Sequence, residues 1–336
     1  MPALRTEITE IVTGLAMLGT ETLDEALSAR PEELLGVDDA TWERLTGAHQ
    51  DRTHAPDFLA AWNNGRAFLT ARDGLRGRRP VVIEWKGGHR DPGDTSVPSD
   101  LRVDHVYLVS CKYLSKVLHN ASPWALFAHH LVGARVRRNE GDWFDAVATR
   151  EHQELYRLVR QRYGADLGLP EAVRSLNTAQ RRLLRRRIPR DWDDGCQAAY
   201  AALVEQASLE STRRWEEGLG TARDREMMLW RLLRLAPAPY FVLGTSAAGS
   251  LRLRVDTPWD FAGAHKVHRL DLRPGTGGQA TVEWSAAVTA RATGEDRSVR
   301  GHVEVRWSHG RFGGPPEAKV YLDTPHERVP GYVTLR

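Results

Sequence analysis

The spacing of apolar residues changes three times along the chain, and these changes most constrain how it can fold. Apolar side chains recur at helical spacing, then at strand spacing, and the two patterns then repeat once more. Near the N-terminus, Thr22 is placed to cap a helix that contains Leu23, Ala26 and Leu27. The chain therefore divides into four predicted segments: a helical N-terminal region at 1–65, a small sheet region at 66–123, a helical basic region at 124–236, and a β-rich module at 237–336.

The strand-like segments are short and are separated by glycine and proline. In the first sheet region they are predicted at 67–69, 81–83 and 103–113, and six more follow Pro239. This order predicts an α+β protein: a small mixed sheet with helices, a helical middle region and a C-terminal antiparallel β module.

Composition excludes several classes of protein. Two cysteines in 336 residues rule out a disulfide framework and a cysteine-rich zinc site. No stretch approaches the roughly 18 unbroken apolar residues of a membrane span, and the first residues lack the order of a signal peptide. We therefore expect a cytoplasmic protein with no membrane partner.

Paired charges on two predicted strands are the first candidate site. Side chains two residues apart on a strand share a face, so Glu84 points the same way as Lys86, and Ser110 the same way as Lys112. Charged side chains are costly to bury on an otherwise apolar strand without a function. The other interpretation is that Glu84 and Lys86 form a solvated pair at the edge of a sheet.

The spacing Asp73, ten residues, Glu84, one residue, Lys86 resembles the motif of the PD-(D/E)xK nuclease superfamily. The strand that contains Ser110 and Lys112 is similar to the core strand of its Mrr-type branch, in which a polar residue can replace the acid. The resemblance implies that Asp73 and Glu84 hold Mg²⁺ and that Lys86, joined by Lys112, supports cleavage of a phosphodiester. A hairpin at 74–79 would bring Asp73 toward the Glu84 strand.

A second set of polar residues suits base excision. Asp104 supplies a carboxylate that could activate water, while Tyr107, His119 and Asn120 could hold a base that is flipped out of the duplex. The alternative is that Asp104 starts a strand and that 120–123 form a turn. If this chemistry operates, no metal is needed.

Arginines are concentrated between residues 171 and 190, where seven of them stand against the single acid Glu171. Like charges four residues apart destabilise a helix unless an anion neutralises them, and a phosphate backbone is a natural partner. Pairing with Asp191, Asp193 and Asp194 is the alternative. The residues predicted to contact nucleic acid here are Arg181, Arg182, Arg185, Arg186 and Arg190.

The C-terminal module contains a second basic cluster. Arg306, Arg311 and Lys319 alternate with aromatic residues, a pattern that suits gripping phosphates and stacking on bases.

These observations together predict an enzyme that processes DNA. The first hypothesis is a metal-dependent endonuclease that acts on foreign DNA, such as phage DNA with modified bases, in restriction. The second is a monofunctional DNA glycosylase that leaves abasic sites. The third is a nucleic-acid-binding protein without catalysis, in which the strand charges are merely solvated.

Overall fold

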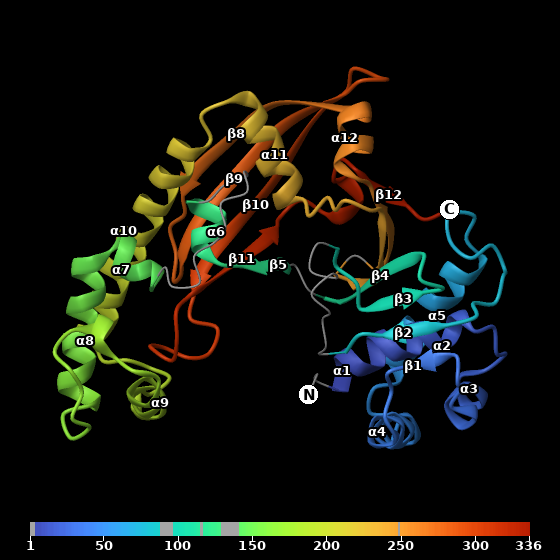
Figure 1. The fold of residues 1–336 in the computed structure, drawn as a ribbon, viewed down its shortest axis with the longest axis horizontal. Coiled ribbons are helices and arrows are strands. Elements are labelled where there is room, and N and C mark those ends of the chain that lie inside the picture. The colour runs from blue at the N-terminus through green and yellow to red at the C-terminus, as the bar shows by residue number, and fades with distance from the viewer. Residues whose placement is uncertain (1–3, 88–96, 115–116, 129–140, 248) are drawn as a thin grey trace. The chain divides into compact units, whose positions relative to one another are not determined.

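The computed structural model describes residues 4–87, 97–114, 117–128, 141–247 and 249–336. The chain forms two compact units that alternate along the sequence (Figure 1). Unit 1 comprises residues 1–115, 235–265 and 325–336, and unit 2 comprises 116–234 and 266–324. The segment 237–336 therefore contributes strands to both units.

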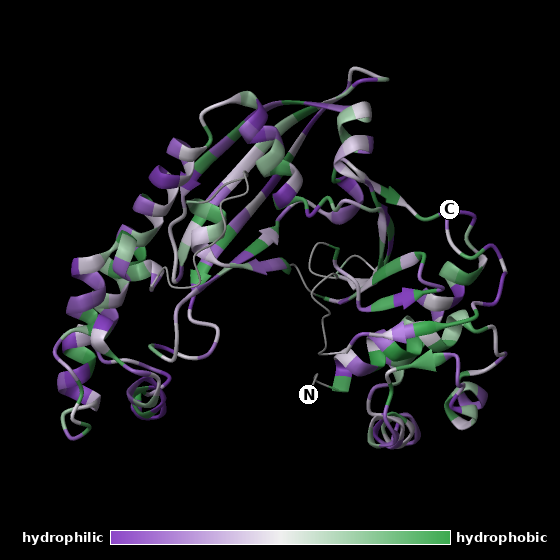
Figure 2. Cartoon of the chain, viewed as in Figure 1, coloured by the Kyte–Doolittle hydropathy of each residue, from purple (hydrophilic) through white to green (hydrophobic). Residues whose placement is uncertain are grey.

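Each unit is built around one sheet that is packed with helices, and the predicted α+β fold class is confirmed. Within the described ranges, the sheet of unit 1 has seven strands and that of unit 2 has five. Apolar residues are concentrated in the strands and in the inward faces of the helices (Figure 2). Among the described residues, no helix is both long and apolar enough to cross a membrane.

Unit 1 begins with three consecutive helical turns that differ in winding: α1 (Leu4–Glu7), the π-helix η1 (Ile8–Val12) and α2 (Thr13–Met17). The helices α3 (Leu23–Ala29), α4 (Asp39–Gln50) and α5 (Ala55–Thr70) follow. Thr22 caps α3 as expected, in a capping box with Glu25, and Asp38 caps α4.

Residues 67–69 are not a strand, because they form the last turns of α5. Phe68 and Leu69 are buried in the core of unit 1. A run of three apolar residues does not reveal its period, so length and context decide between helix and strand.

The sheet of unit 1 contains β1 (Leu34–Leu35), β2 (Ile83–Trp85), β3 (Leu101–Val103), β4 (Tyr107–Tyr113), β6 (Tyr240–Ser246), β7 (Gly249–Val255) and β12 (Tyr332–Thr334), in that spatial order. β2, β3 and β4 form an antiparallel meander, and β6 lies parallel to β4. Gly244 on β6 lies opposite Lys112, and a Cβ atom there would be 1.9 Å from the Lys112 carbonyl oxygen. The helix α12 (Pro258–Ala264) and the 3₁₀ turn η3 (His326–Arg328) complete the unit.

Unit 2 contains the helices α6 (Pro123–Phe127), α7 (Trp143–Val147), α8 (Thr149–Tyr163), α9 (Thr178–Arg187), α10 (Asp194–Gly218) and α11 (Ala222–Leu232), and the 3₁₀ turn η2 (Val173–Ser175). Its antiparallel sheet has the order β5 (Val117–Ala121), β11 (Glu317–Leu322), β10 (Asp296–Arg306), β9 (Ala280–Ala290) and β8 (His265–Pro274). The long helix α10 packs on β9, where Val282, Trp284 and Ala286 are buried while Glu283 between them is exposed.

Candidate functional site

The register of the β2–β3–β4 meander aligns polar residues in a row across the sheet of unit 1. Leu101 on β3 pairs with Trp85 on β2 and with Val109 on β4. The adjacent row holds Lys86 and Ser110, which follow Trp85 and Val109, and Asp100, which precedes Leu101 because β3 runs the opposite way. Two main-chain hydrogen bonds hold this row in place, from Lys86 N to Asp100 O at 2.9 Å and from Asp100 N to Val109 O at 2.8 Å.

The carboxylate of Asp100 is anchored on β4 through one of its two oxygens. Asp100 Oδ2 accepts a hydrogen bond from Cys111 N at 2.6 Å and one from Ser110 Oγ at 3.2 Å. For Oδ1, the part of the chain that the structure describes provides no partner. The carboxylate is therefore fixed in orientation and has one oxygen available to a ligand.

Lys112 lies on the same face of β4 as Ser110, two residues further along the strand. Cys111 between them points into the core and is 9% exposed. Burial raises the pKa of the Cys111 thiol well above its usual value, and the negative charges of Asp100 and Glu10 raise it further, while Lys112 opposes them. The thiol therefore stays protonated.

Glu10 comes from the π-helical turn η1 and is 7% exposed. Its Oε2 accepts a hydrogen bond from Trp85 Nε1 at 2.6 Å, which ties the helix to the end of β2. Single π turns inside α-helices occur frequently at functional sites, because the wider turn changes the direction of the side chains that it carries. Here the turn carries a carboxylate in the middle of a buried helical stretch.

No protein-family model, curated protein or solved structure matches the chain. The chemistry of the site therefore follows from its own side chains. Ser110 and Lys112 offer a hydroxyl and a positive charge on one face of β4, and Asp100 offers a carboxylate hydrogen-bonded to that strand. Glu10 offers a second carboxylate from η1, on the side to which Cys111 points.

The structure brings only part of the predicted nuclease motif to this site. Lys86 lies in this row, and Lys112 lies two residues beyond it on β4. Glu84 is two residues before Lys86 and forms a two-pronged ion pair with Arg102 on β3. The hydrogen bonds from Arg102 lower the pKa of Glu84 against the opposing effect of burial, so Glu84 is an ionised partner of arginine.

Asp73 has different partners from those predicted. Its main-chain N donates to the carbonyl of Arg336 at 3.1 Å, and its carboxylate accepts from Arg336 N at 3.3 Å. The predicted hairpin at 74–79 is wrong, because Gly74, Leu75 and Gly77 donate main-chain hydrogen bonds back to the last turns of α5 and the residue that follows it. The turn therefore packs on the helix that precedes it.

The residues proposed for base excision belong to different units. Asp104 and Tyr107 lie in unit 1, and His119 and Asn120 lie on β5 of unit 2. Asp104 has a positive φ of 50°, and its Oδ1 accepts hydrogen bonds from the main-chain N of Val81 at 2.7 Å and of the next residue at 3.0 Å. This carboxylate therefore holds the β3–β4 turn against the segment that leads into β2.

Tyr107 also has a packing role. Its ring lies against Phe68 and Phe241, and its hydroxyl donates to the carbonyl of Gly74 at 3.3 Å. On β5, Asn120 lies opposite Lys319 of β11.

The predicted arginine segment contains α9, which ends at Arg187, and most of the arginine side chains in the segment are exposed. Arg181 reaches the carbonyl of Phe312 and lies 3.9 Å from the buried Asp142. Within the described ranges, four exposed arginines form no ion pair with any acid: Arg182, Arg185, Arg186 and Arg190. Pairing with Asp193 is excluded as the explanation for them, because Asp193 caps α10 and binds Arg162.

In the second basic cluster, of Arg306, Arg311 and Lys319, both arginines have partners within the protein. Arg306 donates to Glu304 at 3.2 Å, and Lys319 lies opposite Glu304 in the sheet. The guanidinium of Arg311 lies 3.8 Å from the ring centre of Trp192 and donates to the carbonyl of Arg190 at 2.9 Å. Arg311 therefore fixes the segment that follows α9.

Sequence reasoning missed two carboxylates of the site. Asp100, nine residues, Ser110, one residue, Lys112 nearly repeats the spacing of Asp73, Glu84 and Lys86. With a serine allowed at the second position, the same pattern would have identified Asp100. Glu10 has a weaker signal, an acidic residue between Ile8 and Ile11 in a segment rich in apolar residues. A charge on the buried face of a helix is a reason to look for a function.

Proposed function

We propose that unit 1 carries a metal-dependent DNA endonuclease site built on Asp100, Lys112 and Glu10, and that the protein restricts foreign DNA. The observation that carries this proposal is the anchored carboxylate of Asp100, which keeps one oxygen available, with Lys112 two residues beyond Ser110 on the neighbouring strand. The resemblance of the strand 107–113 to the PD-(D/E)xK core supports the same chemistry.

The donor atoms of the site suit Mg²⁺. This ion prefers oxygen ligands and is usually held by one or two carboxylates, with waters and substrate phosphate oxygens filling the other positions. Asp100, anchored on β4, would supply one carboxylate, and Glu10, held by Trp85 Nε1, would supply the other. When bound, Mg²⁺ would lower the pKa of an attacking water and neutralise charge on the phosphate.

The side chains of the chain would orient the reaction. Asp100 cannot rotate away, because Cys111 N and Ser110 Oγ hold its other oxygen. The ammonium of Lys112 would stabilise the negative charge that develops on the phosphate as water attacks phosphorus and the bond to the sugar oxygen breaks. The thiol of Cys111, buried and protonated, takes no part as a nucleophile.

Unit 2 would hold the DNA through α9. Arginines suit phosphate because the planar guanidinium donates two parallel hydrogen bonds. Arg182, Arg185, Arg186 and Arg190 are exposed and have no acidic partner among the described residues, so a phosphate backbone would neutralise the like charges of the helix.

The test is cleavage of plasmid DNA and of phage DNA with modified bases by the wild-type protein and by Lys112→Ala. We expect Mg²⁺-dependent breaks that EDTA abolishes, and a loss of at least about 100-fold in the variant, the usual size for losing a group that stabilises transition-state charge. Lys266→Ala is the matched control, because Lys266 is an exposed lysine on β8 of unit 2.

Two results would contradict the proposal. Full activity in Lys112→Ala would remove this lysine from the site. Breaks that resist EDTA and appear only after hot alkali would indicate abasic sites and thus a glycosylase.

A further inference from the structure

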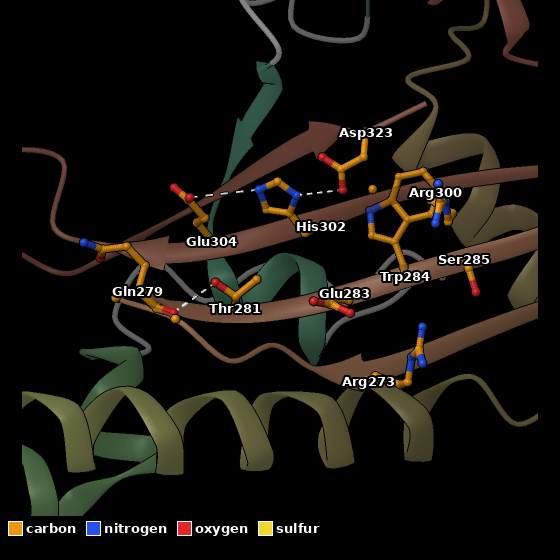
Figure 3. Close-up of a pocket in the computed structure, with 13 residues that line it drawn as sticks. Arg273, Gln279, Thr281, Glu283, Trp284, Ser285, Arg300, His302, Glu304 and Asp323 are labelled. Carbon is orange, nitrogen blue, oxygen red and sulfur yellow. Dashed lines mark hydrogen bonds and ion pairs between the residues drawn. The ribbon is translucent and has the colours of Figure 1, made fainter. Parts of the chain in front are cut away.

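A cavity lies in unit 2, on the sheet formed by β8, β9 and β10 (Figure 3). Its volume is about 610 Å³, within the range of about 300–1,000 Å³ typical of pockets that hold small ligands. The proposed nuclease site does not use it.

The lining is polar because of the register between β9 and β10. Glu283 pairs with His302, and Ser285 pairs with Arg300. Directly paired residues of antiparallel strands project from the same face of a sheet, so these four side chains share one side. They line the cavity together with Arg273 from β8.

The cavity floor depends on a glycine. Gly301 pairs with Trp284, and a Cβ atom at position 301 would be 2.3 Å from the indole ring and 2.2 Å from the carbonyl oxygen of Tyr321. The absence of a side chain lets the ring of Trp284 lie against β10. The floor is therefore closely packed, which favours a cavity of defined shape.

Some of the lining side chains are already held by neighbours. His302 Nδ1 lies 2.9 Å from Asp323 Oδ2, and its ring stacks on Tyr321 with centroids 4.6 Å apart. Figure 3 shows this imidazole between Asp323 and Glu304. The histidine is therefore oriented before any ligand arrives.

Three other charged side chains of the lining are not engaged. Arg273, Arg300 and Glu283 form no ion pair and no side-chain hydrogen bond with any residue that the structure describes. Two guanidiniums offer fork-shaped donors, and one carboxylate offers acceptors.

We propose that this cavity binds a nucleotide. A simple anion would be repelled by the carboxylates of Glu283, Glu304 and Asp323, and a simple cation would be repelled by Arg273 and Arg300. A ligand that satisfies both kinds of group carries acceptors and donors at separate places, as a nucleotide does with its phosphate, its base carbonyls and its amino groups. Arginine pairs with phosphate or with the acceptor edge of guanine, and a carboxylate accepts from the amino group of cytosine.

We infer that the nucleotide belongs to the DNA substrate, an inference that rests on the proposed nuclease function. A nucleotide unstacked from the DNA strand would enter the cavity, and the cavity would then determine which base or base modification is accepted. Enzymes that read a base in this way contact its hydrogen-bonding edge, which is inaccessible in the intact stack.

Two measurements on the full chain test the proposal. The first is titration with the four deoxynucleoside monophosphates and 5-hydroxymethyl-dCMP, followed by calorimetry. The second is binding of duplexes with 2-aminopurine at single positions, whose fluorescence rises when the base leaves the stack. We expect measurable affinity for at least one nucleotide, a loss of at least 10-fold in Arg300→Ala, and a changed order of base preference in Glu283→Gln.

Arg297→Ala is the matched control, since Arg297 lies on the same strand, outside the cavity, and pairs with Glu295. Nucleotide binding without a rise in 2-aminopurine fluorescence would assign the cavity to free nucleotides and overturn the DNA source. Absence of both signals, or equal losses in Arg300→Ala and Arg297→Ala, would overturn the proposal.

The two proposals fail separately. Nucleotide binding that depends on Arg300 but occurs in a protein that never cleaves DNA would refute the nuclease function alone. Cleavage that depends on Lys112 with no nucleotide binding would refute the cavity alone.

Discussion

Replacing Asp100 by alanine and by asparagine separates its structural role from its chemical one. In Asp100→Ala the buried main-chain N–H of Cys111 loses its 2.6 Å acceptor, and the Ser110 hydroxyl loses a 3.2 Å partner. Leaving a buried donor unpaired costs about 1–3 kcal/mol, and a second, weaker hydrogen bond adds up to about 1 kcal/mol. The expected loss in the free energy of unfolding is therefore about 1–4 kcal/mol.

Asp100→Asn keeps an oxygen acceptor for the Cys111 N–H, so its stability should stay within about 1 kcal/mol of the wild type. Its cleavage activity should still fall by at least about 100-fold, because the amide lacks the negative charge that a metal ion requires. Urea denaturation and Mg²⁺-dependent plasmid cleavage measure the two quantities on the same preparations. An alanine variant as stable as the wild type would refute the anchoring role, and an asparagine variant that cleaves normally would refute the chemical role.

Three further predictions concern other charged groups. Arg182→Glu combined with Arg186→Glu should weaken DNA binding for all sequences in a filter-binding assay. It should also flatten the slope of log K against log salt by about 2, because each phosphate that is no longer neutralised contributes roughly 0.9. An unchanged slope would remove α9 from the interface. Glu84→Gln should lower the free energy of unfolding by about 1 kcal/mol, because the ion pair with Arg102 is lost, and should leave DNA cleavage unchanged. Loss of cleavage with retained stability would place Glu84 in the active site. Arginines on the same helix lower the pKa of Glu210 from 4.5 to about 2, so its stabilising effect is present above pH 4.5 and is lost as the pH falls toward 2. Because those arginines are partly exposed, Glu210→Gln should lower the free energy of unfolding by about 1 kcal/mol at pH 7 and by almost nothing at pH 2, as measured by thermal unfolding. A difference that does not depend on pH would contradict the ion pair.

The sequence alone determined the local elements and several of their ends. The capping box at Thr22 involves residues only three positions apart, so local spacing is sufficient to predict it. The alternation within β4 likewise placed Ser110 and Lys112 on one face, because side-chain direction in a strand depends only on position along it. The α+β order followed from the same local periods.

Only the tertiary structure decided which carboxylate accompanies Lys112. Asp73, Asp100 and Asp104 all stand near predicted strands, and the register of the meander places Asp100 in the row of Ser110 while Asp104 caps a turn. A shift of one residue in that register would move every side chain of the strand to the opposite face, and no local pattern specifies the shift. Gly244 shows the same limit: it lies beside Lys112 only because β6, distant in the sequence, adds to the sheet in parallel, a pairing decided by packing over the whole of unit 1.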